Sequence, residues 1–393
     1  MVGEIASLHV GSAGCAIGEQ LWTQYAIQHG IATTDSDPII RNEEGFKSSI
    51  FEMVDGKDID YNHFARAVFV DTDSEAITKI KSRSNISKLV HPDNLISGKE
   101  GSSDNFVRGY YTVGRDSCRN AVESVRKIVE KCDRLEGFNW FQAFGGGTGS
   151  GVAMKLLDEL ATEYPKLENF FHSVFPSSKY STSVVETYNF VFGLESLLEK
   201  SSVTFVTTNE AMYNYCQNHQ VVSNPDLTDI NKVLAQFVCT TNACLRFPSQ
   251  FAGDMKTQTI HLAPSPGCSL VLPAMVEKKH MNIQYMVTKT ILSPSHCLAG
   301  ENLNNGKALS ACLHYTGPKI KTSELSRSSK SLREDLNFAD ECGGGVKVNY
   351  TYENVVNGTL SFCCNHSSVV SLLKNQAKKF DLMYGKCNLN IGQ

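Results

Sequence analysis

Residues 144–151 read Phe144-Gly145-Gly146-Gly147-Thr148-Gly149-Ser150-Gly151, with five glycines in eight positions. Such a density is incompatible with the interior of a helix or a strand. The stretch follows an apolar run at 138–144, which predicts a buried strand, and precedes a helical pattern from Val152. Glycines let backbone N–H groups approach a ligand closely, and the N-terminus of a helix suits a phosphate group. The pattern therefore predicts a strand, a glycine loop and a helix arranged to hold a nucleotide.

The alternation of strands and helices continues on both sides of this stretch. Strands are predicted at 4–10, 66–71, 138–144, 169–175 and 203–208, and helices at 11–30, 116–132, 152–164, 186–199 and 210–217. Asp116 is interpreted as a helix N-cap, and residues 31–64 as a polar, irregular surface segment. The alternation predicts an α/β fold with a parallel, doubly wound sheet, in which ligands bind beyond the C-terminal strand ends. The loops at Gly11, Asp71, Gly101, Gly145 and Asn209 all fall at that edge.

The second half of the chain has a different pattern. One long central helix is predicted over 226–245, and strands are predicted at 269–276, 308–315, 346–352 and 359–365, with two helices among them. A last helix is predicted from Ser367 to about Tyr384. We therefore expect a nucleotide-binding domain at 1–225, a central helix at 226–245 and a smaller α/β domain at 246–393.

Composition excludes several classes of protein. The chain has 393 residues, 41% of them hydrophobic, and a formal net charge of −4, which disfavours nucleic-acid binding. No apolar run is long enough to span a membrane, and the first ten residues carry Glu4 and His9, unlike a signal peptide. The 13 cysteines are scattered and odd in number, so we interpret them as reduced thiols of a cytosolic protein.

Other phosphate-binding motifs fit the glycine stretch less well. A P-loop is excluded because no Lys follows the last glycine directly. A dinucleotide-binding loop has the spacing Gly-x-Gly-x-x-Gly and follows the first strand, whereas this stretch has a different spacing and lies far from residue 10. A tight turn without a ligand remains a weaker alternative.

Several further motifs accompany the glycine stretch along nearly the whole chain. They are His9-Val10-Gly11, Arg66-Ala67-Val68-Phe69-Val70-Asp71, Asn209-Glu210-Ala211 and Lys379-Phe380-Asp381-Leu382-Met383-Tyr384. With these motifs the chain resembles the tubulin family. The first half and residues 379–384 look most like alpha-tubulin, whereas residues 244–248 and Gln250 look more like beta-tubulin.

The resemblance implies a GTP-binding subunit that joins head to tail with a beta-type partner, as a structural constituent of microtubules and the cytoskeleton in the cytoplasm. It implies GTP and Mg²⁺ as cofactors. Carried over by position, the nucleotide-binding residues are Gly11, Ser12, Ala13, Ser102, Asp104, Gly146, Gly147, Thr148, Gly149, Thr182, Glu186, Asn209 and Asn231. Asp71 and Asp73 stand where the magnesium-associated acids of the family stand.

These residue types suit those roles. Two side-chain amides can offer donors and acceptors to the guanine edge, and carboxylates hold Mg²⁺ through its water shell. Two alternatives stay open on the residues alone: the acids also suit a helix start, and Asn209 and Asn231 also suit helix caps.

The chain also departs from the family pattern. Ser12 and Ala16 replace two glutamines, Gly101 replaces an acid, and Leu227 replaces an aromatic ring that stacks on the base. Each lost hydrogen bond costs about 0.5–1.5 kcal/mol, so together these changes are expected to weaken nucleotide binding.

The position of the family's hydrolytic residue differs as well. Thr257 stands where alpha-tubulins place a Glu that activates water against the GTP of the next subunit. A neutral hydroxyl cannot act as a carboxylate base near neutral pH, so no catalytic residue is assigned.

The chain is also expected to lack the last helices and the acidic tail of the family, because it ends at Gln393. These departures keep a second hypothesis open: a degenerate module that binds tubulin or caps filaments without polymerising or hydrolysing GTP. A self-sufficient GTPase is a third hypothesis, and it has no evident general base.

Overall fold

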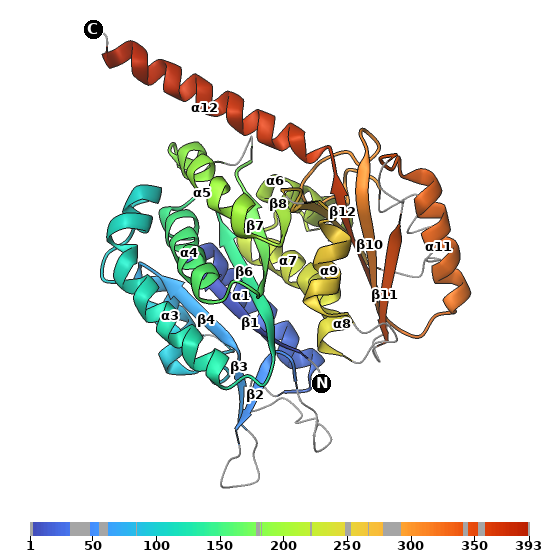
Figure 1. The fold of residues 1–393 in the computed structure, drawn as a ribbon, viewed down its shortest axis with the longest axis horizontal. Coiled ribbons are helices and arrows are strands. Elements are labelled where there is room, and N and C mark those ends of the chain that lie inside the picture. Colours follow the sequence, from blue (N-terminus) through green and yellow to red (C-terminus); the bar gives the residue numbers. More distant parts are fainter. Residues whose placement is uncertain are drawn as a thin grey trace.

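Ten strands form one mixed sheet in the computed structural model of this chain, in the order β11-β10-β12-β9-β8-β7-β6-β1-β4-β5 (Figure 1). The structure describes residues 3–31, 48–54, 62–83, 85–177, 181, 183–220, 222–247, 253–265, 267–277, 292–340, 345–352 and 358–391. The strands of this sheet are β1 (Glu4–Val10), β4 (Ala67–Asp71), β5 (Leu95–Ser97), β6 (Leu135–Ala143), β7 (Glu168–Phe175), β8 (Val203–Thr208), β9 (Leu270–Glu277), β10 (Ala308–Gly317), β11 (Val346–Tyr352) and β12 (Thr359–His366).

The part of the sheet from β5 to β9 is parallel, and its strand order reverses next to β1. Strand β12 then pairs antiparallel with both β9 and β10, and β10 pairs parallel with β11. The predicted doubly wound α/β fold is therefore confirmed. The sheet runs on without a break into the second half of the chain, because Thr204 of β8 pairs with Leu270 of β9. The division at residues 225 and 245 stays a proposal about domains.

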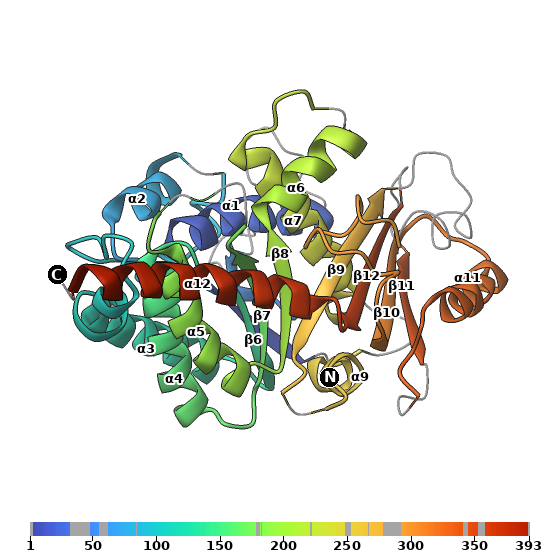
Figure 2. The same cartoon turned by 90° about the horizontal axis from the view of Figure 1, so that it is seen from above.

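Helices cover both faces of the parallel part (Figures 1 and 2). One face carries α3 (Gly114–Glu130), α4 (Ala153–Glu163) and α5 (Glu186–Lys200), whose apolar side chains form one core cluster with Trp140 and Phe171. The opposite face carries α1 (Gly11–Gln28), α2 (Ser74–Arg83), α6 (Asn209–Tyr215) and α7 (Leu227–Thr241), which enclose a second cluster. The other α-helices among the described residues are α8 (Ala243–Arg246), α9 (Met255–Leu262), α11 (Thr322–Asp335) and α12 (Val369–Ile391).

A row of stacked rings crosses five neighbouring strands on the α1 and α7 face. Phe69, His9, Phe141, His172 and Phe205 are register partners on β4, β1, β6, β7 and β8. Their successive centroids lie 4.5, 4.6, 4.9 and 4.9 Å apart, with interplanar angles of 17° or less. We call these five residues the ring ladder. It fixes the strand register directly beneath the edge of the sheet where the predicted ligand loops begin.

The two histidines of the ring ladder differ in their hydrogen bonds. Trp22 Nε1 donates to His9 Nε2 at 3.0 Å, so one nitrogen of His9 is paired. Both ring nitrogens of His172 are buried without a partner among the described residues. Burial lowers the pKa of each histidine to about 3, so both are neutral at physiological pH.

Three predicted elements differ from the structure. Residues 31–64 are not wholly irregular, because β2 (Phe51–Val54) pairs antiparallel with β3 (Asn62–Ala65). Asp116 is not an N-cap: a π-helical segment at Arg108–Thr112 continues through Val113 into α3, which places Asp116 in the first turn. The last helix extends beyond the predicted residue 384, to Ile391.

The predicted single central helix at 226–245 is also wrong. Asp226 is the N-cap, α7 ends at Thr241, and a short α8 follows Asn242. The hydroxyls of Thr240 and Thr241 donate to the carbonyls four residues earlier, each at 2.9 Å. Such bonds compete with the backbone ladder and bend helices, which accounts for the break.

Candidate functional site

The candidate site lies where the strand order reverses, at the carboxyl ends of β1 and β6. Gly11 follows β1 directly and has φ +78°, a left-handed conformation that favours glycine. A Cβ atom on Gly11 would lie 3.1 Å from the backbone nitrogen of Gly149. The first loop and the glycine loop therefore touch, in the crevice where doubly wound sheets bind their ligands. Ser12 and Ala13 follow in the first turn of α1.

The glycine loop itself leads into a π-helical segment, Thr148–Val152, which continues as α4. Ser150 closes this bend, since its backbone N–H and its hydroxyl both donate to Gly146 O, at 3.2 and 2.7 Å. The first N–H groups of a helical segment have no partner within it, so this end can bind an anion. Gly147 and Gly149 leave no room for side chains, because an added Cβ would lie 2.5 Å from Asn105 N and 2.3 Å from Ala143 O respectively.

A third loop, at 102–105, packs against the glycine loop. Ser102 is buried, and its hydroxyl lies 3.0 Å from Thr148 Oγ1. Thr72, which follows β4, joins both: its hydroxyl lies 2.6 Å from Thr148 Oγ1 and accepts from Ser102 N at 3.2 Å. Asp104 is exposed, with its Oδ1 3.6 Å from a Cβ built on Gly146. The structure thus brings together four predicted loops, and it adds Thr72, which sequence reasoning missed although it follows Asp71 directly.

The two predicted metal acids differ in environment. Asp71 is 4% exposed, and burial raises the pKa of its carboxyl to about 6, although the backbone N–H groups of Asp73 and Thr72 oppose this. Asp73 is exposed. The charge of the buried Asp71 carboxylate is poorly compensated, and the hydroxyls of Thr72 and Thr148 lie beside it. These oxygen donors suit a hydrated Mg²⁺ ion. The residues fit that ion, whose charge would offset the charge of Asp71.

Asp71→Asn is expected to stabilise the nucleotide-free chain, by about 1–3 kcal/mol at pH 7, because the amide removes a buried charge. The same change should weaken Mg²⁺-dependent nucleotide binding about tenfold or more. Chemical denaturation and nucleotide titrations with Mg²⁺ or EDTA measure the two effects separately. Asp73→Asn is the exposed control for stability. A destabilised Asp71→Asn protein would contradict this account of the carboxyl.

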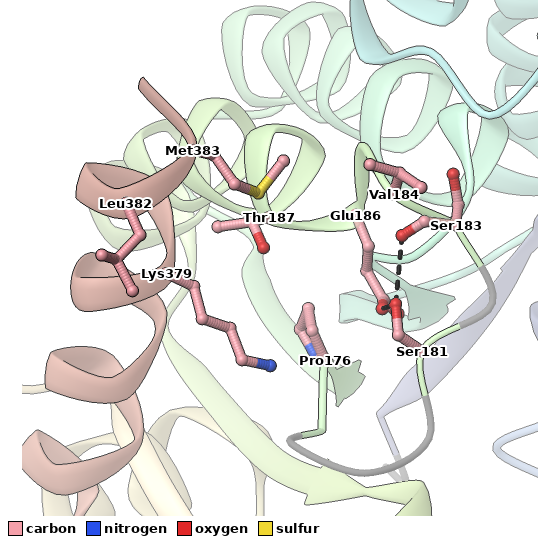
Figure 3. A pocket seen from close by; sticks show the side chains of 9 residues that line it. All are labelled: Pro176, Ser181, Ser183, Val184, Glu186, Thr187, Lys379, Leu382 and Met383. Carbon is pink, nitrogen blue, oxygen red and sulfur yellow. Dashed lines mark hydrogen bonds between the residues drawn. The ribbon is translucent and has the colours of Figure 1, made fainter. Parts of the chain in front are cut away.

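The ribose side of the predicted site lies at the start of α5. Glu186 is 9% exposed and accepts a hydrogen bond from Ser181 Oγ at 2.6 Å, and burial raises the pKa of its carboxyl. It lines an open pocket of about 260 Å³, and α12 lines another side of this pocket with Lys379, Leu382 and Met383 (Figure 3). Thr182 lies outside the described residues.

The two predicted base-reading residues lie on α6 and α7, which pack together. Asn209 is the first residue of α6, but Thr208 is its N-cap, and Asp226 is the N-cap of α7. The alternative that Asn209 and Asn231 are helix caps is therefore wrong. Neither side-chain amide has a hydrogen-bond partner among the described residues. Leu227, at the start of α7, is 62% exposed.

Thr257 lies at the opposite edge of the sheet from the glycine loop. It is exposed on α9, whose N-cap Asp254 accepts from Thr257 N at 3.0 Å. Helix α9 is attached to the amino ends of two strands, because Met255 N donates to Glu136 of β6 and Thr259 donates to Glu168 of β7. Residue 257 therefore cannot reach the glycine loop of its own chain.

Comparisons with known proteins agree with this geometry. Residues 4–217 match the Tubulin/FtsZ family, GTPase domain. The chain is 32% identical to the tubulin alpha-1 chain of Saccharomyces cerevisiae, across 98% of this chain and 90% of that protein. In the described part of the structure, no helix is both long and apolar enough to cross a membrane.

Proposed function

The chain belongs to the Tubulin/FtsZ family, and we propose that it is a GTP-binding, tubulin-like cytoskeletal subunit that joins head to tail with a beta-type partner in microtubules. The observation that carries this proposal is the junction of three loops around Thr148, which faces the carboxyl ends of β1, β4 and β6. The loops at 11–13, 102–104 and 146–149 would hold the phosphates. Glu186 with Thr182 would meet the ribose, and Asn209 with Asn231 the guanine. We place the protein in the cytoplasm, on the cytoskeleton.

Mg²⁺ belongs to the same proposal. Asp71, and Asp73 through water, would hold the ion, which would neutralise charge on the phosphates. The hydroxyls of Thr72, Ser102 and Thr148 already bond to one another at 2.6 and 3.0 Å. They would keep the phosphate side of the site in one geometry before the nucleotide arrives, which reduces the entropy lost on binding.

The two edges of the sheet support the proposed head-to-tail assembly. The glycine loop and its neighbours lie at the carboxyl ends of the strands, and α9 with Thr257 lies at the amino ends of β6 and β7. Stacking subunits along this direction would bring α9 of this chain toward the nucleotide of the adjoining beta-type partner. Because Thr257 is a neutral hydroxyl, the chain would contribute no carboxylate base there. Slow or absent hydrolysis at that junction is the expected consequence.

One observation favours the second hypothesis, a tubulin-like module that binds or caps filaments without propagating them. Leu227 is exposed where an aromatic residue would stack on guanine, and Ser12 and Ala16 replace two amides of the first loop. These changes would weaken nucleotide binding, and with it the contact to the next subunit, while the family fold is kept.

Co-sedimentation and microscopy of tagged protein with polymerising tubulin separate the two hypotheses. A lattice-forming subunit should label microtubules along their length, in proportion to its share of the dimer pool. Label confined to filament ends, or a loss of polymer with increasing protein, would instead establish the capping module. Multiple turnover of GTP by the isolated chain at high dilution would contradict both.

A further inference from the structure

Asn189, in the first turn of α5, hydrogen-bonds to two loops of the candidate site, the third loop and the glycine loop. Its side chain is 2% exposed, and both the oxygen and the nitrogen of its amide are hydrogen-bonded to backbone atoms. Its Oδ1 accepts from Phe106 N at 2.9 Å, and its Nδ2 donates to Asp104 O at 2.7 Å and to Gly145 O at 3.0 Å. One side chain therefore holds both the end of loop 102–105 and the start of the glycine loop.

The loop that Asn189 holds has an unfavourable backbone. Ser103 and Asp104 have φ values of 51° and 52°, in the left-handed region that costs free energy for residues other than glycine. Such conformations persist where surrounding contacts fix them. The glycine loop lies directly against this backbone, because a Cβ on Gly147 would lie 2.5 Å from both Asn105 N and Asn105 O. A shift of either loop would therefore move the other.

We propose that Asn189 is a positioning residue that makes loop 102–106 and the glycine loop at 144–151 one rigid unit, so that both present their backbone to phosphate together. Its side chain acts through Asp104 O, Gly145 O and Phe106 N and does not touch the nucleotide. The phosphate part of this inference rests on the proposed GTP-binding function. The coupling of the two loops concerns the chain's own backbone and can be measured without nucleotide.

Asn169 provides a matched control. It lies at the amino end of β7, whereas the candidate site lies at the carboxyl ends of the strands. It is 6% exposed, its Oδ1 accepts from Trp140 Nε1 at 2.9 Å, and its Nδ2 donates to Lys200 O at 3.4 Å. Asn169→Ala removes a buried amide with similar bonds, far from the phosphate loops. It reports the general loss of stability that any buried asparagine would give.

The test compares wild type, Asn189→Ala, Asn189→Asp and Asn169→Ala by amide hydrogen exchange on nucleotide-free protein and by affinity for GTP and for guanosine. Asn189→Ala should speed exchange about tenfold or more in both 102–109 and 144–151. It should also weaken GTP binding about 10–100-fold while changing guanosine binding by less than about threefold. Asn189→Asp keeps the acceptor for Phe106 N but turns an oxygen toward Asp104 O and Gly145 O, so its effect should be at least as large. Asn169→Ala should neither speed exchange selectively in these two segments nor weaken GTP binding relative to guanosine binding.

Two outcomes would overturn the inference: exchange that rises in only one of the two loops, or equal effects of Asn189→Ala and Asn169→Ala on both readouts. A wild-type chain that binds no GTP would instead overturn the proposed function. The exchange experiment would still decide whether Asn189 joins the two loops.

Discussion

Gly147→Ala is expected to weaken nucleotide binding strongly and to destabilise the chain. Its Cβ would lie 2.5 Å from Asn105 N and O and 2.7 Å from Asn105 C, all backbone atoms that cannot rotate away. Forcing the two loops apart should cost about 1–3 kcal/mol of folding free energy, as other overpacked sites do. The displaced loop would lose two or more charge-assisted hydrogen bonds to phosphate, each worth about 1.5–3 kcal/mol, so affinity should fall by at least ~100-fold.

Two neighbouring glycines give matched controls for this variant. A Cβ on Gly101 would meet nothing within 4 Å, so Gly101→Ala should change neither stability nor binding. A Cβ on Gly146 would meet only Asp104 Oδ1, at 3.6 Å, an ordinary contact. Gly146→Ala should therefore fold normally and lose affinity only through contact with the nucleotide itself. Fluorescent GTP titrations and thermal melts of the three variants measure both quantities. Normal binding by folded Gly147→Ala would contradict the proposed phosphate site.

His172→Phe is expected to stabilise the chain by about 1–3 kcal/mol at neutral pH. Its two ring nitrogens are buried and unpartnered, and a buried polar group without a hydrogen bond costs about that much. Phenylalanine keeps the stack between Phe141 and Phe205, both at 4.9 Å. His9→Phe is the matched control, because it removes one unpartnered nitrogen, Nδ1, but leaves Trp22 Nε1 without its acceptor. These two effects oppose each other, so His9→Phe should lack the stabilisation expected of His172→Phe.

The advantage of His172→Phe should grow in acid. The pKa of His172 is lowered from 6.5 to about 3 in the folded chain. Between these values the unfolded chain binds a proton that the folded chain does not, so stability falls as pH falls below 6.5. Without His172, the unfolded chain takes up one proton fewer in this pH range. The free energy of unfolding should then fall less steeply with pH, by about 1.4 kcal/mol per pH unit. Denaturant midpoints at pH 7.5 and pH 5 measure it. A variant that is less stable than wild type at both pH values would show that His172 has a partner.

Local patterns in the sequence were enough for much of the fold and for the positions of the first loop and the glycine loop at the carboxyl edge of the sheet. The glycine stretch and Gly11 could be recognised because their backbone conformations depend on the residue itself and on its nearest neighbours in the chain. The reversal of strand order next to β1 then brings them together. The family resemblance pointed to Asp71, at the end of β4, and to Ser102 and Asp104 of the third loop. Thr72, which follows Asp71, and Ser102 both bond to Thr148.

Features that depend on distant partners were not predicted from the sequence. Asn189 bonds to residues 85 and 44 positions away, and the pairing of Thr72 with Thr148 spans 76. The ring ladder depends on the register of five strands, which periodicity alone does not give. The break at Asn242 depends on competition between threonine hydroxyls and the backbone, whereas an apolar 3.6-residue pattern continues across it.

If the loops around Thr148 hold a guanine nucleotide, the purified chain should carry one. Denaturing extraction of the chain, alone and with a beta-type partner, followed by chromatography, identifies and counts the released nucleotide. We expect GTP or GDP in about one-to-one ratio with the chain, and much less from Gly147→Ala. A folded wild-type chain that releases no guanine nucleotide in either preparation would contradict it.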